Sequence, residues 1–170
     1  MNFVFFCVTF SLDKEGIDMQ WNPEDLSAFF QAKDYIDTVI LPITSISFTN
    51  KEEAEKLAIQ KRSLEIVSQE MERNYAGRIF VCPVYIYPHH VNRQTEIDRI
   101  NSWTEEMLAE HFEHRFILSH DIGWKKYEKQ FEANFIWTPS FSLKNFQTDE
   151  ARQFMKEQTT ELSDLIRSYW

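Results

Sequence analysis

The apolar stretch Thr38-Val39-Ile40-Leu41-Pro42-Ile43 decides the fold of this 170-residue chain. A nearly uninterrupted run of this kind, without polar alternation, is typical of a strand that is buried on both faces. The strand has room to continue through Ser45-Ile46-Ser47-Phe48 after a break at Pro42. We therefore expect an α/β fold that includes this buried strand.

Helix signals stand on both sides of this strand. Asn22-Pro23-Glu24-Asp25 supplies an N-cap, a proline at the first helical position and two acids in the first turn. We expect a helix from there to about Tyr35. Asn50 and Glu53 form a capping-box pattern that opens a second helix, and Gly77 stands where its C-terminal cap belongs.

Strands and helices keep alternating in the rest of the chain. The expected elements are a strand over residues 78–87, a helix over 92–111, a strand over 115–118, a helix capped by Asp121, a strand over 135–137 and a helix opening at 148–150. Pro83 argues for an edge, a bulge or a break in the first of these strands. Alternation of this kind implies right-handed crossovers. We expect a doubly wound, mainly parallel sheet of about four strands with helices on both faces, as in flavodoxin-like or Rossmann-like three-layer sandwiches, with the strand order open.

Residues 1–18 are expected to lie outside the single folded domain, which we place at residues 19–170. The apolar run at 3–10 is too short to cross a bilayer, and it lacks the positive region and cleavage site of a secretory signal. Lys14-Glu15-Gly16 can be encoded by a purine-rich stretch that matches a bacterial ribosome-binding site, at ordinary spacing from Met19. We expect translation to begin at Met19 and residues 1–18 to be a non-native extension; an added edge strand is the alternative.

Composition excludes several classes of function. The formal net charge of −9 gives a surface that repels phosphate backbones and anionic headgroups, so we expect no nucleic-acid and no membrane partner. Three widely separated glycines cannot build the clustered loop of a P-loop or a dinucleotide fingerprint. Two cysteines do not make a disulfide framework, so we expect a reducing, cytoplasmic location, with Cys82 as a buried small hydrophobe.

Four features carry a resemblance to a known family: Gln31-Ala32-Lys33-Asp34-Tyr35-Ile36-Asp37-Thr38, Gly77-Arg78-Ile79-Phe80, the helix with Trp103, and the terminal Tyr169-Trp170. Together they resemble the YpiF-like family of small bacterial proteins, a domain of unknown function. The resemblance covers nearly everything after Met19, which also supports that residue as the start. Because the family has no assigned activity, the resemblance implies no catalytic or binding residue here.

Polar residues leave the strands at their carboxyl ends, where ligands gather in parallel sheets. They are Thr44-Ser45 or Thr49-Asn50, Pro88-His89-His90, Ser119-His120-Asp121 and Thr138-Pro139-Ser140. The expected candidate pocket consists of His89, His90, Ser119, His120 and Asp121. If the cluster binds a zinc-like ion, its ligands would be His89, His120 and Asp121, with His90 as a substitute for His89.

Structural roles explain the same residues more simply. Asp121 can serve as an N-cap, a function that Ser119 could share, and His89-His90 can form a solvated turn. Ser119-His120-Asp121 is not a catalytic triad, because consecutive residues cannot converge as triad members do. No helical His-x-x-x-His spacing and no cysteine-pair spacing anchors a metal, so we assign no metal and no cofactor.

Two functions of different classes remain. The favoured one is a protein-interaction or scaffold module whose partner is another protein or a second copy of the chain. Tyr169 and Trp170 are its candidate contact residues, and it predicts an exposed apolar patch. The alternative is a small-molecule or metal-dependent enzyme or sensor that uses the His/Asp cluster, and it predicts a concave pocket at the strand ends.

Overall fold

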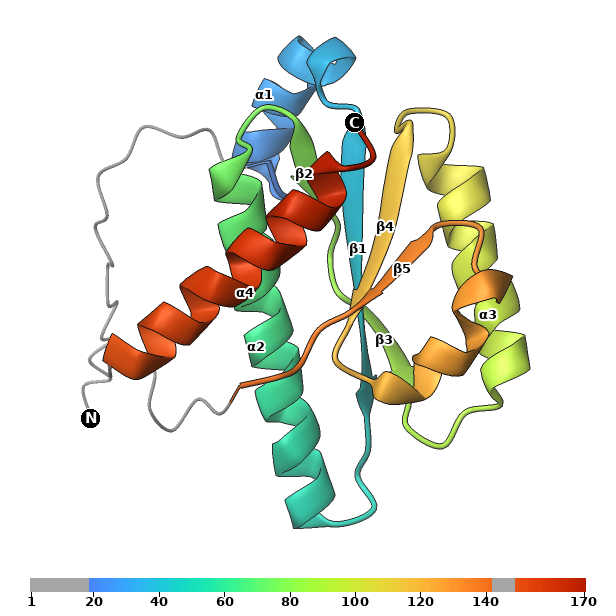
Figure 1. The fold of residues 1–170 in the computed structure, drawn as a ribbon. Helices are drawn as coiled ribbons and strands as arrows, with labels where there is room; N and C mark the ends of the chain where they lie inside the picture. Colours follow the sequence, from blue (N-terminus) through green and yellow to red (C-terminus); the bar gives the residue numbers. More distant parts are fainter. Residues whose placement is uncertain (1–18, 142–148) are drawn as a thin grey trace, which may run out of the picture.

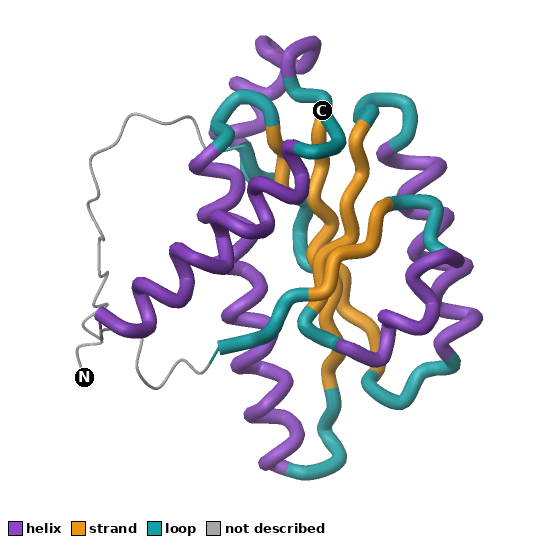
Figure 2. Tube along the Cα trace, viewed as in Figure 1, coloured by secondary structure: helices purple, strands orange, loops and turns teal. Residues whose placement is uncertain are grey.

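Strand β1 (Thr38–Ile46) lies at the centre of the sheet in the computed structural model, which describes residues 19–141 and 149–170. The expected extension over residues 1–18 lies outside the described residues. The other elements, in chain order and drawn in Figures 1 and 2, are α1 (Pro23–Ala32), η1 (Lys33–Tyr35), α2 (Lys51–Asn74), β2 (Ile79–Val81), β3 (Tyr85–Pro88), α3 (Arg93–Ser102), η2 (Trp103–Leu108), β4 (His114–Ser119), η3 (Ile122–Gln130), β5 (Asn134–Trp137) and α4 (Asp149–Arg167).

Every strand pairing in the described part of the chain is parallel. On one side β1 pairs with β4, which in turn pairs with β5. On its other side β1 pairs with β2 through residues 38–40 and with β3 through residues 43–46. The strand order is β2-β1-β4-β5, with β3 beside the second half of β1. This arrangement confirms the expected parallel α/β sheet.

Pro83 explains why the sheet has five strands where the sequence predicted about four. The expected strand over residues 78–87 is broken into β2, which ends at Val81, and β3, which begins at Tyr85. Proline has no backbone N–H, so it cannot continue the ladder of hydrogen bonds along β1. After the break, β3 runs parallel to the end of β1, and the amide of His89 donates to the carbonyl of Ile46 at 2.9 Å.

Helices cover both faces of the sheet and divide the core in two (Figure 1). On one face α2 and α4 pack around Ile40, Leu64 and Ile166. On the other face α1, α3 and η3 pack around Leu41 and a second set that includes Trp124. The expected three-layer arrangement is therefore confirmed. Among the described helices, none combines the length and apolar character that a membrane span requires.

Capping side chains fix where the helices begin, as the sequence predicted for Asn22, Asn50 and Asp121. First-turn amides donate hydrogen bonds to the side chains of Asn22, Asn50, Asn92 and Asp121. Gly77, just past the end of α2, has a φ of +86°, in the left-handed region that favours glycine. These starts and stops are local, so they could be read from short stretches of sequence.

The helix expected over residues 92–111 is not uniform. The α-helical part, α3, ends at Ser102, and η2 continues from Trp103 to Leu108 as a π-helix. Short π-helical turns inserted into α-helices are rare and frequently occur at functional sites. In this protein the π-helical turn forms one wall of a cavity of about 810 Å³.

Candidate functional site

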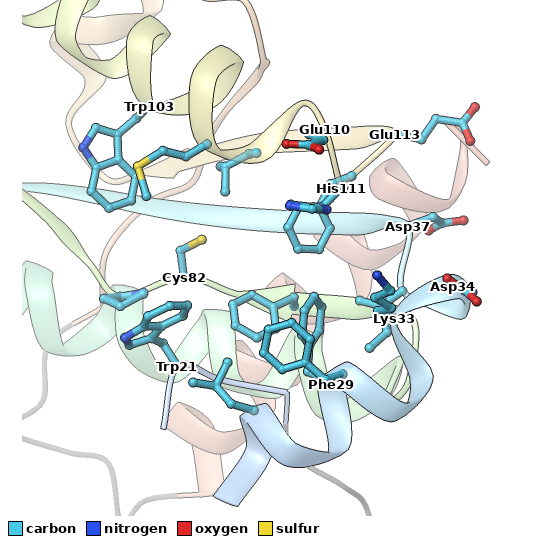
Figure 3. Close-up of a pocket in the computed structure, with 18 residues that line it drawn as sticks. Trp21, Phe29, Lys33, Asp34, Asp37, Cys82, Trp103, Glu110, His111 and Glu113 are labelled. Carbon is cyan, nitrogen blue, oxygen red and sulfur yellow. The ribbon is translucent and has the colours of Figure 1, made fainter. Parts of the chain in front are cut away.

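A cavity of about 810 Å³ lies between α1 and η2, and we name it the apolar cleft. Its size falls within the range of about 300–1,000 Å³ that is typical of ligand pockets. Phe29 of α1, Phe80 of β2 and Phe112 form an aromatic cluster in its wall, with ring centroids 5.0 Å apart for Phe29–Phe80 and 6.0 Å apart for Phe80–Phe112. Figure 3 shows Trp21 and Trp103 at one end of the cleft.

The other end of the apolar cleft is acidic. Asp34, Glu110 and Glu113 lie there together with Lys33 and His111 (Figure 3). Among the described residues, none of these three carboxylates forms an ion pair. Unpaired carboxylates at the mouth of an apolar cavity favour an occupant that carries positive charge.

Asp37, at the same end, is already paired. Its Oδ2 lies 2.9 Å from Nη2 of Arg78. Burial raises the pKa of Asp37, but the hydrogen bonds from Arg78 and Thr38 and the Arg78 charge outweigh it, so the pKa lies below its ordinary value. Asp37 is therefore a structural anion rather than a free contact for an occupant.

Cys82 lines the apolar cleft as a buried, free cysteine. Burial raises the pKa of its thiol to about 12, so the thiol is protonated at neutral pH. Because the thiolate is the nucleophilic form, burial makes Cys82 a weak nucleophile. The prediction that Cys82 is a buried small hydrophobe is confirmed.

A second cavity, of about 430 Å³, lies at the carboxyl end of β1, and we name it the strand-end cavity. Three of the five predicted pocket residues line it: His89, His120 and Asp121. His90 is not in its lining and has a largely exposed imidazole. Ser119 is fully buried, and its hydroxyl donates to the carbonyl of Ile43 and accepts from the amide of Asp121.

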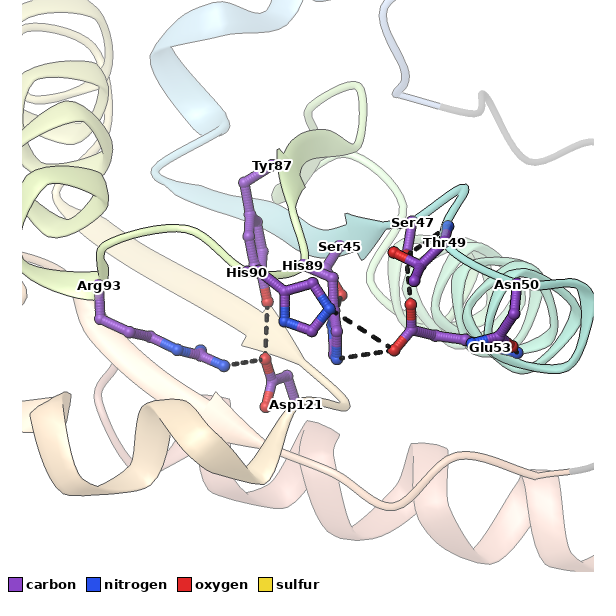
Figure 4. A network of polar contacts seen from close by, with 10 residues as sticks. All are labelled: Ser45, Ser47, Thr49, Asn50, Glu53, Tyr87, His89, His90, Arg93 and Asp121. Atoms are coloured by element: carbon purple, nitrogen blue, oxygen red, sulfur yellow. Dashed lines mark hydrogen bonds and ion pairs between the residues drawn. The ribbon is translucent and has the colours of Figure 1, made fainter.

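Asp121 is held in a structural network within this site. Its Oδ2 accepts from Nη2 of Arg93 at 2.7 Å and from the hydroxyl of Tyr87 at 2.9 Å (Figure 4). Its Oδ1 accepts from the amide of Gly123. Burial raises the pKa of Asp121, but the contacts with Arg93, Gly123 and Tyr87 together lower it below its ordinary value. Trp124 extends the network, because its Nε1 donates to the Tyr87 hydroxyl.

His120 is a buried, neutral imidazole. Burial lowers its pKa, and a hydrogen bond between Nδ1 and the carbonyl of Thr138, at 2.7 Å, opposes this shift only in part. Since a carbonyl only accepts, Nδ1 carries the proton and Nε2 is an acceptor. Among the described residues, Nε2 of His120 has no hydrogen-bond partner.

Two residues that the sequence reasoning did not select complete the strand-end cavity. Ser45 Oγ lies 2.9 Å from Nδ1 of His89, and Oε1 of Glu53 lies 3.9 Å from Nε2 of His89 and 3.8 Å from Nε2 of His90. Ser45 was noted only as a residue that leaves a strand, and Glu53 only as part of a capping box. The predicted cap bond exists, since the Glu53 amide donates to Asn50 Oδ1 at 2.9 Å, but the carboxylate faces the histidines.

The hypothetical zinc ligands are each engaged elsewhere. Within residues 19–141 and 149–170, no three His, Cys, Asp or Glu side chains are arranged to hold a metal ion. His89 contacts Ser45, His120 contacts Thr138, and Asp121 is bound to Arg93. Each of these three side chains is therefore held by other groups of the fold.

The predicted contact residues at the C-terminus pack against the fold. Nε1 of Trp170 donates to Oγ1 of Thr38 at 2.9 Å, and the guanidinium of Arg78 lies 3.8 Å from the centroid of the indole. Tyr169 is partly exposed and contacts the ring of Phe116 edge-on. Trp170 therefore closes the amino-terminal end of the sheet.

Comparison with known proteins bears out the resemblance seen in the sequence. The chain is 29% identical over 154 residues to the uncharacterized protein YpiF of Bacillus subtilis (strain 168), an alignment that covers 89% of this chain and 98% of that protein. No solved structure matches the chain. A family model described as protein of unknown function (DUF2487) matches residues 27–170, which is most of the chain. The chain therefore belongs to the DUF2487 family.

Proposed function

We propose that the chain is a protein-interaction module whose apolar cleft receives one amphipathic, basic helix of a partner protein. The observation that carries this proposal is the exposure of large apolar side chains around the cleft. Trp21 is 65% exposed, Phe30 68% and Met107 54%. Apolar side chains that gather in water around a cavity are characteristic of binding surfaces.

A helix suits this surface better than a small molecule does. Trp21 and Phe30 line the cleft but are mostly exposed, so a small molecule would cover only part of each ring, whereas a helix laid along the cleft would cover more of both. Recognition of a helix in a groove uses apolar side chains at positions i, i+3 or i+4, and i+7 of the helix. The aromatic cluster of Phe29, Phe80 and Phe112 would receive such side chains.

Charge favours a basic partner. The carboxylates of Asp34, Glu110 and Glu113 outnumber the Lys33 ammonium at the acidic end of the cleft. The formal net charge of the whole chain, −9, has the same sign. Complementary charges accelerate encounter and fix the orientation of a bound helix. The partner helix should therefore carry lysines or arginines next to its apolar face.

Helix α1 supports the proposal because it has no fully buried residue. Leu26 and Phe29 of this helix pack against the core, while the side chain of Phe30 is exposed to solvent. Full burial of a phenylalanine side chain contributes roughly 1.5–3 kcal/mol. A partner that covers Phe30 would thus stabilise both the complex and α1.

Fluorescence anisotropy with a synthetic helical peptide tests the proposal. The probe is a Leu/Lys peptide with leucines at i, i+3, i+4 and i+7, and we expect it to bind. One matched peptide has the same composition with its leucines spread around the helix, and another replaces lysine by glutamate. We expect both to bind about tenfold more weakly or worse, which corresponds to about 1.4 kcal/mol.

Two variants localise the binding. Phe30→Asp, at the cleft, should weaken the Leu/Lys peptide by about tenfold or more, as loss of an apolar anchor does. Phe48→Asp is the matched control, because Phe48 is 91% exposed and lies beyond the carboxyl end of β1. Equal weakening by both variants, or equal affinity for the three peptides, contradicts the proposal. A dimer in light scattering that Phe30→Asp dissociates would assign the cleft to a second copy instead.

We also propose that the module acts in the cytoplasm. Cys82 is a free thiol in a buried position, which suits a reducing compartment. Fractionation of cells that produce the chain from its own gene tests this location, and recovery in the membrane or extracellular fraction contradicts it.

A further inference from the structure

We propose that Ser45, His89 and Glu53 form a nucleophilic relay in the strand-end cavity that cleaves small acyl esters. This activity is separate from the proposed binding of a partner helix and uses a different cavity. Ser45 Oγ lies 2.9 Å from Nδ1 of His89, a distance that suits transfer of the hydroxyl proton to the imidazole. On the far side of the ring, Nε2 lies 3.9 Å from Oε1 of Glu53, within ion-pair distance.

Three separate segments bring these groups together. Ser45 lies near the carboxyl end of β1, His89 follows β3, and Glu53 lies in the first turn of α2. Figure 4 shows the three side chains next to one another. Nucleophile, base and orienting carboxylate that converge from distant positions are the recurring arrangement of hydrolytic triads, whatever their order in the chain.

Contacts from the loop after β1 fix the carboxylate of Glu53. Ser47 Oγ donates to Oε2 of Glu53, which directs Oε1 toward His89 and His90. The amide of Glu53 is held in turn by Oδ1 of Asn50. Glu53 is a positioning residue: its charge favours the imidazolium that forms when His89 takes the Ser45 proton.

Two further features of the cavity suit the reaction. The first turn of α2, a helix of 24 residues, opens onto it through Asn50, Glu52 and Glu53, and the partial positive charge of a helix N-terminus stabilises a developing oxyanion. His120 also lines the cavity, and its Nε2 is an acceptor without a hydrogen-bond partner among the described residues. That nitrogen can accept a hydrogen bond from a substrate hydroxyl or from water.

Burial of the nucleophile sets the class of substrate. Ser45 is only 3% exposed, so an acyl carbon reaches its hydroxyl through the cavity and not from the open surface. A cavity of about 430 Å³ admits a short acyl group on a small alcohol more readily than a long chain. Esters of acetate-sized acids are therefore the expected substrates.

With water as the second substrate, every proton and electron pair in the reaction is accounted for. The Ser45 proton passes to Nδ1 of His89 while Oγ bonds to the acyl carbon and the carbonyl electrons move onto oxygen. Collapse of this adduct breaks the bond to the alcohol oxygen, which leaves with the proton from His89. Water then gives a proton to His89 and attacks the acyl carbon. The proton returns to Ser45 Oγ as the carboxylic acid leaves.

A fluorophosphonate probe and p-nitrophenyl acetate test the relay in the full chain. We expect the probe to label Ser45, identified by mass spectrometry of peptides. Ser45→Ala and His89→Gln should both lose the label and slow hydrolysis by about 10²-fold or more. Ser102→Ala and His111→Gln are matched controls, since both residues are exposed and lie away from the cavity. The controls should keep full label and rate.

Glu53 variants separate positioning from general structure. Glu53→Gln should lower kcat by about tenfold and leave KM unchanged, because the imidazolium that forms when His89 takes the Ser45 proton loses its neighbouring carboxylate. Glu53→Asp should restore part of the rate. The other charged or titratable groups around Glu53 and His89 are Glu52, Lys56, His90, His120 and Asp121. Glu55→Gln, on the same helix but outside the cavity lining, therefore serves as the control for a change of charge, and it should keep the rate.

Three results overturn the relay. They are an unlabelled native protein, a label or rate that persists in both Ser45→Ala and His89→Gln, and a loss of kcat in Glu55→Gln as large as that in Glu53→Gln. Circular dichroism shows whether each variant folds. Ser45→Ala and His89→Gln alter different segments, so if one of these variants unfolds, the other still tests the relay. Binding of the Leu/Lys peptide should be unchanged in Ser45→Ala, so the two proposals fail separately.

Discussion

The backbone amide of Met19 donates a 2.8 Å hydrogen bond to Oε1 of Glu72, and both residues are buried. Glu72 lies in the last turn of α2, and the carbonyl of Met19 accepts from the amide of Val81 in β2. One residue thus ties the start of the described chain to a helix and to the edge of the sheet. A buried carboxylate is stable only where such donors surround it.

Glu72→Ala should lower the free energy of unfolding by about 1–3 kcal/mol, the cost of leaving a buried donor without its acceptor. Urea titration followed by circular dichroism measures this change. Glu72→Gln keeps an acceptor oxygen and should cost less. Glu70→Ala is the control, because its ion pair with Arg73 is partly exposed and such pairs contribute roughly 0–1 kcal/mol. Equal losses in Glu72→Ala and Glu70→Ala would refute the role of the Met19 contact.

His120 should make stability depend on pH in a defined window. Burial lowers its folded pKa below the ordinary value of 6.5, so below pH 6.5 the unfolded chain binds a proton that the folded chain does not. The free energy of unfolding therefore has its full value above pH 6.5 and decreases as the pH falls below 6.5. Asp37 and Asp121, whose pKa values are also lowered, act only below about their ordinary value of 3.8.

Urea titrations at pH 7.5 and pH 5.5 measure the effect of His120. Other charged groups that line its cavity are Glu52, Glu53, Lys56, His89 and Asp121, so the wild-type slope alone does not assign it. His120→Gln should flatten the difference between the two pH values, while the exposed His111→Gln should keep it. A slope that survives in His120→Gln would show that another group titrates.

Much of the fold could be predicted from the sequence because its signals are local. An asparagine such as Asn50 caps a helix through the next turn of chain, and Pro83 breaks a strand at its own position. The parallel sheet then follows from alternation of elements. The π-helical turn at Trp103 carries no comparable local signal, so residues 92–111 were expected as one regular helix.

The site was only partly predictable, because contacts between distant segments decide it. His89 and His120 were found since both follow strands of one sheet, whose ends meet at one edge. Glu53 was missed because its position in a capping box explained it without a further contact. The apolar cleft was missed because exposure of Phe30 and Met107 depends on which helix faces α1, a property of tertiary packing.

Trp170→Ala should destabilise the fold rather than change its assembly. The indole donates to Thr38, stacks under the Arg78 guanidinium and meets the ring of Tyr75 at 5.0 Å. Because Trp170 is only partly buried, we expect a loss of about 2–4 kcal/mol, somewhat below the roughly 3–5 kcal/mol of a core Trp→Ala change. Urea titration measures the loss and light scattering the mass. If Trp170→Ala lowers the free energy of unfolding less than Tyr169→Ala does, or changes the molar mass, Trp170 instead contacts a partner.

Cys82 should resist modification in the folded protein and report on the apolar cleft. Burial raises the pKa of its thiol to about 12, so very little of the thiol is ionised near pH 8. In a Cys7→Ser background, reaction with Ellman's reagent should be slow in the native state and fast in urea. Because Cys82 lines the cleft, the bound Leu/Lys peptide should slow the native reaction further, and the scrambled peptide should not. Fast native reaction would mean that the cleft opens to solvent around Cys82, and equal protection by both peptides would mean that the helix binds elsewhere.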